Sequence, residues 1–433
     1  MNSSHSMREV AFIDGIRTPF LRSQTDFASF SAFDLGRFAL SGLINRTKLN
    51  GSLIQHLYFG NVIQDINTSN IARELTLASG LPDSIPATTV SMACISSNVA
   101  FTSAVNALIT GEANAAIAGG VEVMSDIPIR FRKKFRQKLL ETQKYRKPTD
   151  WFKLFKGLRP SDLLPEVPSI SEYSTGETMG KSSDKMSAKY GVSRQEQDEY
   201  AIRSHQLAAE ATEKGLLSNE IVPVGINSGE SIIKSDNGIR GDSTLEKLSS
   251  LRPAFIKPHG TATAGNSSFL TDGASAALLM EKEYALQHGY HPKALVRGFS
   301  YVAKKPGDEL LIGPALAVPI VLSSMNLTLN DIDVFEFHEA FAGQMCTVLK
   351  ALNSTRFAKE NLNRDKKVGE IPMDKLNRWG GSLSIGHPFG ATGTRLITTA
   401  ANRLIHEDGR FALIAACAAG GQGHAMILER ADS

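Results

Sequence analysis

The hydrophobic and polar positions of the chain form two successive series with the same order. The first series predicts a strand, a helix and a second strand at residues 9–15, 34–44 and 54–62. The second series predicts the same three elements at residues 293–299, 314–325 and 331–341. In this arrangement Leu57 to Gly60 correspond to Phe335 to His338.

Later segments continue the correspondence. Residues 94–122 and 387–423 both have the pattern of a turn, a helix, a buried strand and a glycine-rich turn. Because strands and helices alternate, a repeat of this length predicts two similar α/β halves packed together. Chance similarity between βα units is the alternative, and four elements matching in order weigh against it.

A segment without this pattern separates the two series and is predicted to be a mostly helical insertion. It contains an amphipathic helix at 193–215, where Ser193 and Glu196 have the spacing of a capping box. Buried-strand character returns at 271–289 and closes the first half. We therefore expect a first half, an insertion and a second half at residues 1–124 with 251–284, 125–250, and 285–433.

Composition and charge are those of an ordinary globular protein. Of 433 residues, 42% are hydrophobic and 21% are charged, and the net charge is only +3. This balance gives no sign of nucleic-acid binding. No apolar run near the ~20 residues that span a bilayer is evident, and the first residues show neither a secretory nor a transit pattern. We therefore expect a reduced, cytoplasmic protein.

Three widely spaced cysteines, Cys94, Cys346 and Cys417, form no CxxC pair, so neither a disulfide framework nor a zinc site is predicted. Cys94 follows a strand-like run and precedes an amphipathic helix. The N–H groups and the dipole at a helix N-terminus stabilise a thiolate, so we expect a lowered pKa for Cys94. Packing as a small buried hydrophobe is equally consistent with this position alone.

Three further loops carry polar or reactive side chains. Glycines bracket His387 and Pro388, which places the histidine on a held turn, as an acid or base requires. Cys417 ends an apolar strand among small residues that allow close approach of a ligand. His338 follows another strand, at the end where α/β folds place ligands. Without a second spaced histidine there, a hydrogen-bonding or acid–base role is favoured, and no metal is predicted.

In this order, the motifs resemble those of the thiolase family over essentially the whole chain. The family motifs Cys-x-Ser, Asn-Glu-Ala-Phe, Gly-His-Pro and Cys-x-Gly correspond to residues 94–96, 338–341, 386–388 and 417–419. His338 and Ala419 stand where many thiolases have asparagine and glycine. This histidine, with the CAAGGQG tail and a basic insertion, looks like the β-subunit branch of fatty-acid oxidation trifunctional enzymes. The resemblance implies a thiolase fold of two βαβαβαββ halves with a helical loop domain.

The resemblance also implies a reaction, the cleavage of a 3-ketoacyl-CoA by coenzyme A through an acyl group on Cys94, which is the last step of fatty-acid β-oxidation. In this scheme His387 takes the thiol proton, and Cys417 protonates the acetyl-CoA enolate and then deprotonates incoming CoA. His387 and a water held by His338 stabilise the enolate, whereas the N–H groups of Cys94 and Ala419 stabilise the tetrahedral intermediate.

Coenzyme A is expected as a co-substrate, with no tightly bound cofactor. Ser268 matches a family serine that contacts the pantetheine arm, and Phe341 and Met179 match residues that line the same channel. Thr178 stands where many thiolases have a histidine, so the contacts there differ. Family members are dimers or larger assemblies, and the resemblance implies a homodimeric core.

Residues 130–160 carry twelve Lys or Arg against two acidic residues, interleaved with aromatic and leucine side chains. A solvated helical face, docking to CoA phosphates or an acidic partner, and contact with an anionic membrane surface all fit this composition. The aromatic content favours a partner or a membrane surface. Related β-subunits pair with a hydratase–dehydrogenase α-subunit, so an α2β2-type complex is expected.

Other functions stay open from sequence. A ketoacyl synthase uses one cysteine with two histidines, so Cys417 argues against that class. A biosynthetic acetoacetyl-CoA thiolase shares every catalytic residue, and a catalytically silent scaffold subunit is disfavoured because all reactive residues are present. The sequence does not fix the acyl chain length or the direction of the reaction in the cell.

Overall fold

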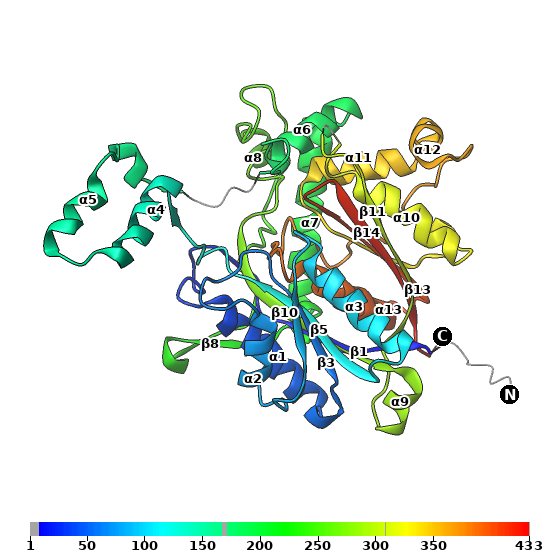
Figure 1. The fold of residues 1–433 in the computed structure, drawn as a ribbon. Helices are drawn as coiled ribbons and strands as arrows, with labels where there is room; N and C mark the ends of the chain where they lie inside the picture. Colours follow the sequence, from blue (N-terminus) through cyan, green and yellow to red (C-terminus); the bar gives the residue numbers. More distant parts are fainter. Residues whose placement is uncertain (1–7, 167–170, 308, 433) are drawn as a thin grey trace.

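A ten-stranded sheet runs through both predicted halves in the computed structural model, which describes residues 8–432 except 167–170 and 308 (Figure 1). Its main strands are β1 (Val10–Arg17), β3 (His56–Gly60), β4 (Ala87–Val90), β5 (Ala115–Glu122), β10 (Thr271–Glu281), β11 (Ala294–Ala303), β12 (Val334–Phe337), β13 (Phe411–Ala418) and β14 (Gln422–Arg430). Their order is β12-β13-β14-β11-β1-β10-β5-β3-β4, and the short β2 (Leu21–Arg22) pairs with β10. Because β1 pairs antiparallel with both β10 and β11, the two halves are joined along it.

The predicted repeat is present in this order of strands. In the first half β3 lies between the parallel strands β4 and β5, and in the second half β12 lies parallel to β13. At the place equivalent to β4, the described part of the second half has a single bridge between Phe335 and Leu376 instead of a strand. This backbone is irregular because it leads into the long loop that carries His387.

Helices cover both outer faces of the sheet and fill the space between its halves. The outer helices are α1 (Ala32–Thr47) and α2 (Ile71–Ala78) on the first half, and α10 (Gly313–Ser324), α11 (Ala342–Leu352) and α12 (Thr355–Leu362) on the second. Two central helices, α3 (Ser96–Thr110) and α13 (Thr392–His406), lie side by side and form one apolar core with strands of both halves (Figure 1). A short helix, α9 (Lys282–Gln287), follows β10.

The segment Ala93–Thr110 is long and apolar enough to cross a membrane, contrary to the expectation that the chain has no such run. The helix in this segment, α3, is mostly buried between the two halves. Its apolar character follows from this position, because a helix enclosed on all sides must be hydrophobic all round.

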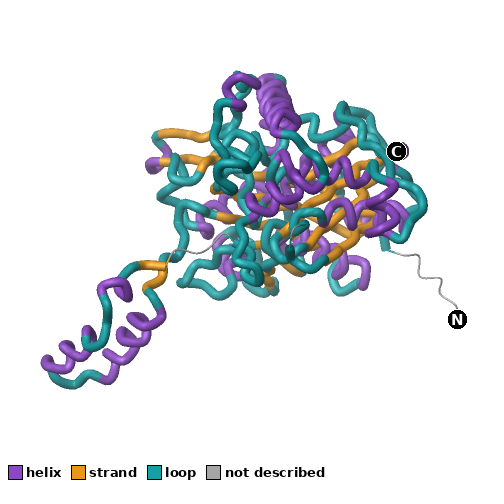
Figure 2. The backbone as a smooth tube through the Cα atoms, turned by 90° about the horizontal axis from the view of Figure 1, so that it is seen from above, coloured by secondary structure: helices purple, strands orange, loops and turns teal. Residues whose placement is uncertain are grey.

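The insertion between β5 and β10 has two parts. In one part, α6 (Met179–Lys189) and α7 (Arg194–Glu213) pack on α11, and α7 begins at the predicted capping box of Ser193 and Glu196. This part also contains α8 (Leu245–Ser249) and the hairpin β8 (Val224–Ile226) and β9 (Ser231–Ile233). The other part, which we call the basic arm, comprises β6 (Arg130–Phe131), α4 (Lys133–Glu141), α5 (Phe152–Phe155) and β7 (Pro165–Glu166). The basic arm projects away from the body (Figures 1 and 2).

Three glycines allow the backbones of the two halves to cross at close range. Gly60 in β3 pairs with Gly120 in β5, and Gly390 belongs to the second half. A Cβ atom on Gly120 would lie 1.8 Å from the carbonyl oxygen of Gly390, and one on Gly390 would lie 2.3 Å from that of Val121. Only glycine permits this approach, which brings the turn after His387 against the first half.

Candidate active site

Cys94 lies in the tight turn between β4 and α3. The residue before it, Ala93, has a φ of +46°, in the left-handed region that residues with a Cβ seldom adopt. The hydroxyl of Ser96 holds the turn, because it accepts from the N–H of Met92 at 2.8 Å and donates to the carbonyl of Ala93 at 2.7 Å. The turn is therefore a fixed backbone structure that presents the thiol at the start of a buried helix.

His387 lies on the loop before α13 and is fixed at both its backbone and its ring. Its N–H donates to the hydroxyl of Thr271 at 3.0 Å, and its Nδ1 atom lies 2.7 Å from Oγ1 of Thr392. The preceding Gly386 has a φ of +115° and packs against Thr271, so the turn requires glycine there. The Nε2 atom of His387 has no hydrogen-bond partner among the described residues.

His338 follows β12 and is completely buried. Its N–H donates to the carbonyl of Ala415 at 2.8 Å, and its Nδ1 atom lies 2.9 Å from Oγ of Ser382. The Nε2 atom is without a partner in the described part of the chain. Burial, followed by the charge of Arg395, lowers the pKa of His338 to about 3, so the ring is neutral at physiological pH.

The structure brings the predicted catalytic side chains together. One ligand atom each of Cys94, His338 and His387 lie within 4.8 Å of one another, and the two imidazole centroids are 4.0 Å apart. Cys417, near the end of β13, is buried and lies close enough to Cys94 for the charge of one to raise the pKa of the other. These residues come from both halves of the repeat.

The expected lowering of the Cys94 pKa is wrong. Burial raises the pKa of this thiol to about 11, although the N–H groups of Ala419 and of Cys94 itself hydrogen bond to it and act in the opposite direction. Loss of solvation of the thiolate therefore outweighs the helix N-terminus. Burial lowers the pKa of His387 well below its usual value, so a neutral imidazole faces a protonated thiol.

A thiol and two imidazoles at this spacing have the ligand chemistry of a soft metal ion. The same three groups are those that a nucleophile, its base and a hydrogen-bond donor need. A cation held by Cys94, His338 and His387 would occupy all three, so metal binding and catalysis by these side chains exclude each other.

The residues predicted to contact coenzyme A are linked by a series of contacts, which we call the wall. The N–H of Ser268 donates to the carbonyl of Ala340 at 3.0 Å, directly before Phe341. The Phe341 ring meets Phe255 edge to face, with centroids 5.7 Å apart. Phe255 in turn covers the backbone of α6 next to Met179, where Thr178 is the helix cap. Whether coenzyme A binds this wall stays a prediction.

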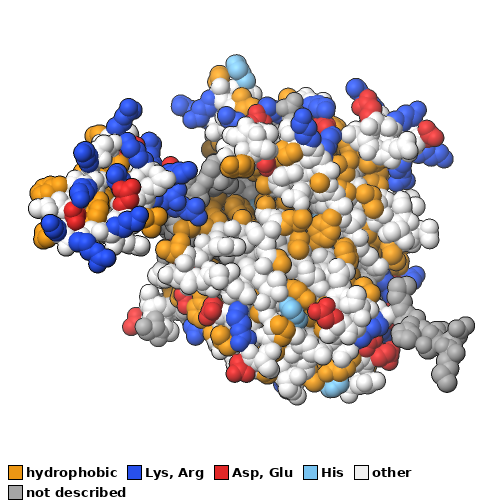
Figure 3. Space-filling model, viewed as in Figure 1, with side chains coloured by type: hydrophobic (Ala, Val, Ile, Leu, Met, Phe, Trp, Pro, Cys, Tyr) orange, Lys and Arg blue, Asp and Glu red, His pale blue; other side chains and the backbone are white. Residues whose placement is uncertain are grey.

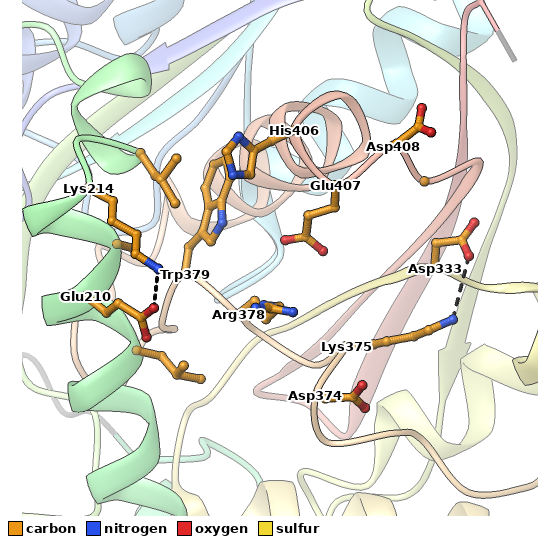
Figure 4. Close-up of a pocket in the computed structure, with 14 residues that line it drawn as sticks. Glu210, Lys214, Asp333, Asp374, Lys375, Arg378, Trp379, His406, Glu407 and Asp408 are labelled. Atoms are coloured by element: carbon orange, nitrogen blue, oxygen red, sulfur yellow. Dashed lines mark hydrogen bonds and ion pairs between the residues drawn. The ribbon is translucent and has the colours of Figure 1, made fainter.

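A separate cavity of about 480 Å³ lies at the other end of α13 and contains none of the predicted site residues. Its lining is highly charged, with both signs present (Figure 4). Lys214 pairs with Glu210, and Lys375 lies 3.6 Å from Asp333. Five acidic and three basic side chains line the cavity, so its lining carries a small excess of negative charge.

Sequence reasoning missed the residues that hold the reactive groups in place. Thr392 and Ser382 bond the two imidazoles, and Glu122 at the end of β5 accepts from the N–H groups of Ile63 and Gly390. A buried Glu after an apolar strand was a signal that could have indicated Glu122. The hydroxyl groups gave no such signal, because Ser and Thr are common throughout the chain.

The family models for the thiolase N-terminal domain and the thiolase C-terminal domain match residues 10–283 and 290–430. The chain belongs to the thiolase family. It is 53% identical to bovine mitochondrial trifunctional enzyme subunit beta over 424 residues, covering 98% of this chain and 89% of that protein. It is also 53% identical over 425 residues to a probable 3-ketoacyl-CoA thiolase of Caenorhabditis elegans, covering 98% and 94% of the two chains.

Solved structures agree with this assignment. Human mitochondrial 3-ketoacyl-CoA thiolase in complex with CoA aligns with a TM-score of 0.83 at 27% identity, covering 98% of each chain. An acetyl-CoA acetyltransferase from Bacillus anthracis aligns with a TM-score of 0.83 at 29% identity, covering 99% of this thiolase and 100% of that chain. The predicted α/β thiolase fold is confirmed.

One expectation about this thiolase is overturned by the same comparisons. The bovine, human and mouse relatives are named as mitochondrial, which contradicts the expected cytoplasmic location. The expectation rested on the lack of a recognisable targeting pattern, and such a lack carries no information about the compartment.

Proposed function

We propose that this thiolase cleaves 3-ketoacyl-CoA with coenzyme A, giving acetyl-CoA and an acyl-CoA shortened by two carbons, as the last step of fatty-acid β-oxidation. The observation that carries the proposal is the meeting of Cys94, His387, His338 and Cys417 in one buried site. The names of the relatives at 53% identity support the same reaction.

The hydrogen bonds of His387 assign it the role of base. The hydroxyl of Thr392 donates its proton to the carbonyl of Pro388 at 2.9 Å, so the contact between Thr392 and His387 must use a proton on Nδ1. The Nε2 atom of His387 then carries a lone pair. It takes the proton of Cys94, and the thiolate attacks the 3-keto carbon.

The next steps break one carbon–carbon bond and pass two protons through Cys417. When the tetrahedral intermediate collapses, its oxygen re-forms a carbonyl and the C2–C3 electron pair passes to the enolate of acetyl-CoA. The Cys417 thiol then protonates C2, which leaves a thioester on Cys94. The resulting Cys417 thiolate takes the proton of incoming coenzyme A, whose sulfur attacks the thioester and expels Cys94 as a thiolate. His387 then returns its proton to Cys94, which restores the enzyme.

Two groups of donors suit the oxygens that become charged. The N–H groups of Ala419 and Cys94 hydrogen bond to the Cys94 sulfur, beside the carbon whose oxygen becomes charged in the tetrahedral intermediate. Such donors typically contribute ~10²–10³ in rate each. Ala419 supplies its donor from the backbone, so the alanine in place of glycine retains the bond. Protonated His387 and neutral His338 face the thioester enolate.

Coenzyme A is bound as a substrate along the wall formed by Ser268, Phe341 and Met179. The support is the continuous contact from Ser268 through Phe341 to the start of α6. Replacing Phe341 by alanine should raise KM for coenzyme A while a distant core substitution, Phe357→Ala, should not. An unchanged KM in Phe341→Ala would move the channel elsewhere.

The deciding experiment is intact mass spectrometry after mixing the protein with a long-chain 3-ketoacyl-CoA in the absence of free coenzyme A. A mass increase equal to the acyl chain shortened by two carbons is expected in the wild type and in Cys346→Ala, and no increase in Cys94→Ala. A short-chain substrate run in parallel tests the alternative of a biosynthetic acetoacetyl-CoA thiolase. No adduct from either substrate would favour a scaffold role.

A homodimer is proposed through the free edge of the sheet. Strand β4 ends the order of strands, its residues are only partly buried, and it leads directly into the half-buried Cys94 turn. The edge of strand β4 presents unpaired N–H and C=O groups, which pair readily with another chain. Light scattering should give twice the chain mass, and Thr88→Lys, which places a charge on the exposed edge of β4, should yield the single-chain mass.

An association with a hydratase–dehydrogenase α-subunit and contact with an anionic membrane surface are the proposed roles outside the site. The basic arm supports both, because it combines many Lys and Arg with exposed apolar side chains (Figure 3). Trp151, Phe152 and Phe155 are 56%, 82% and 59% exposed. Few exposed loops carry three such rings together.

One set of variants separates these two roles. Replacing Trp151, Phe152 and Phe155 together by serine should abolish sedimentation with cardiolipin-containing vesicles if the basic arm contacts lipid. Co-expression with the α-subunit should still give a complex if docking uses another surface. Loss of the complex with vesicle binding retained would assign the basic arm to the partner.

A mitochondrial location is proposed as well, and immunofluorescence against a matrix marker tests it.

A further inference from the structure

Arg395, in the first turn of α13, is a buried cation with few partners. Its side chain has no exposed surface, and its closest carboxylate oxygen, on Glu336, is 3.7 Å away. Its Nε and Nη1 atoms have no hydrogen-bond partner among the described residues. By contrast, Arg403 in the same helix bonds Glu336 at 2.7 Å and Glu407 at 2.9 Å. A buried charge held this loosely is costly unless it serves a purpose.

The hydrogen bond that Arg395 does make leads to the active site. Its Nη2 atom donates to Oγ of Ser382 at 3.1 Å, and the same Oγ lies 2.9 Å from Nδ1 of His338. A guanidinium has donors only, so it can occupy a lone pair of the serine and cannot accept the serine proton. The hydroxyl proton of Ser382 has Nδ1 of His338 as its acceptor among the described residues.

This direction of donation fixes the tautomer of His338. If Nδ1 accepts a hydrogen bond from the Ser382 hydroxyl, the neutral ring carries its own hydrogen on Nε2, the atom that faces the site. His387 has the opposite arrangement, because Thr392 gives its proton to Pro388 and must accept from Nδ1. Two neutral imidazoles 4.0 Å apart thus present one donor and one acceptor.

We propose that Arg395 and Ser382 are positioning residues that hold His338 as the Nε2–H tautomer, so that it is a permanent hydrogen-bond donor to the enolate oxygen formed when the C2–C3 bond breaks. The proposal deepens the thiolase reaction and rests on it. It gives the two histidines separate roles: His387 exchanges a proton, and His338 keeps its own.

The nearby charges are consistent with this division. Burial, followed by the positive charge of Arg395, disfavours a second proton on His338 and keeps its pKa low. At His387 burial and the charge of His338 have larger effects on the pKa than Arg395 does. Glu336 offsets the charge of Arg395 from the strand that delivers His338. Arg395 therefore orients Ser382 and keeps His338 neutral without touching the substrate.

A spectrum that does not depend on turnover tests the tautomer. In protein labelled with ¹⁵N-histidine, a long-range ¹H–¹⁵N correlation spectrum should show His338 protonated on Nε2 and His387 protonated on Nδ1, with His338→Asn and His387→Asn used for assignment. The Ser382→Ala variant should shift His338 toward the other tautomer, and Ser382→Thr should preserve the wild-type pattern. Protonation of His338 on Nδ1 in the wild type would overturn the proposal.

Kinetics separate positioning from structural support. Ser382→Ala and Arg395→Met should lower kcat roughly 10–100-fold with KM nearly unchanged, and Ser382→Thr should restore most of the activity. In a His338→Asn background the Ser382→Ala change should have less than a twofold further effect, because its target is gone. Equal losses in both backgrounds would show that Ser382 acts through the fold and overturn the proposal.

The formation of an acyl group on Cys94 is followed by mass in the same samples. A wild-type protein that forms no adduct but shows the expected tautomers would contradict the thiolase reaction. It would still support the hydrogen bonds from Arg395 to Ser382 and from Ser382 to His338. Adduct formation with His338 protonated on Nδ1 would support the thiolase reaction and contradict the positioning roles of Arg395 and Ser382. The two ideas can thus fail separately.

Discussion

Glu122 and Gly390 are 268 positions apart in the chain and are joined by a hydrogen bond of 3.1 Å from the glycine N–H to the carboxylate. The same carboxylate accepts from the side chain of Asn61 and from the N–H groups of Val62 and Ile63. One buried side chain therefore fastens the loop after β3, the end of β5 and the turn that follows His387.

Glu122→Gln should disrupt this junction, because all four partners are N–H donors and a glutamine amide would turn its own donors toward some of them. Burial raises the pKa of Glu122 to about 8, so most of the carboxyl is neutral at pH 7 and its hydrogen bonds contribute only about 0.5–1.5 kcal/mol each. We therefore expect a loss of about 1 kcal/mol in the free energy of unfolding, together with a lower kcat. Urea denaturation and steady-state kinetics measure both. The exposed Glu283→Gln is the control, and equal behaviour of the two variants would contradict the assignment.

Thr392→Val should reduce kcat roughly 10–100-fold, in the range seen when an outer partner of a functional histidine is removed. Valine keeps the shape of threonine but cannot accept the Nδ1–H of His387, so the base loses its fixed orientation. The matched control is Thr394→Val on the same helix, since its hydroxyl has no hydrogen-bond partner among the described residues. Comparable losses in the two variants would mean that valine damages α13 itself.

Alkylation of Cys94 by iodoacetamide should keep rising with pH up to about 10. Burial raises the pKa of this thiol to about 11, so the reactive thiolate increases tenfold for each pH unit below that value. Peptide mapping measures the modified fraction of Cys94 at each pH, with Cys94→Ala as the blank. A plateau below pH 8 would indicate a thiolate–imidazolium pair in the free enzyme instead.

His424 should make the protein less stable in acid. Burial lowers its pKa to about 3, and its Nδ1–H donates to the carbonyl of Ser300 at 3.1 Å. Because the folded pKa is below the unfolded value near 6.5, the stabilisation is complete above pH 6.5 and is lost as the pH falls toward 3. At pH 5 the loss is about 2 kcal/mol.

The variant His424→Asn should retain the donor and remove this loss. The measurement is the difference in free energy of unfolding between pH 7 and pH 5, which should shrink by about 2 kcal/mol relative to the wild type. Taking a difference cancels any cavity that the smaller side chain leaves. The exposed His259→Asn should leave the difference as it is, and a matching change there would refute the role of burial.

The sequence was sufficient for the order of the elements and for the reactive residues, for physical reasons. Periodic burial leaves a period in the residue types, so both series of strands and helices were visible. Cys94, His387 and Cys417 were detected because each stands on a turn among small residues. Their meeting in one site was implied by the resemblance to the thiolase family.

Three features could not be obtained in this way. The raised pKa of Cys94 depends on how much solvent the fold removes, and local sequence contains only the opposing helix N-terminus. The roles of Thr392, Ser382 and Arg395 depend on which lone pair each hydroxyl uses. Glu122 has mainly backbone partners, and any residue type can supply an N–H group.

The crossing of Gly60, Gly120 and Gly390 has a consequence for how such a chain changes over generations. At the crossing, a methyl group added in one half would collide with the main chain of the other, and no substitution in the first half can make room. The two copies of the repeat can therefore differ in their reactive side chains, but at these three positions a change in one copy is limited by the backbone of the other.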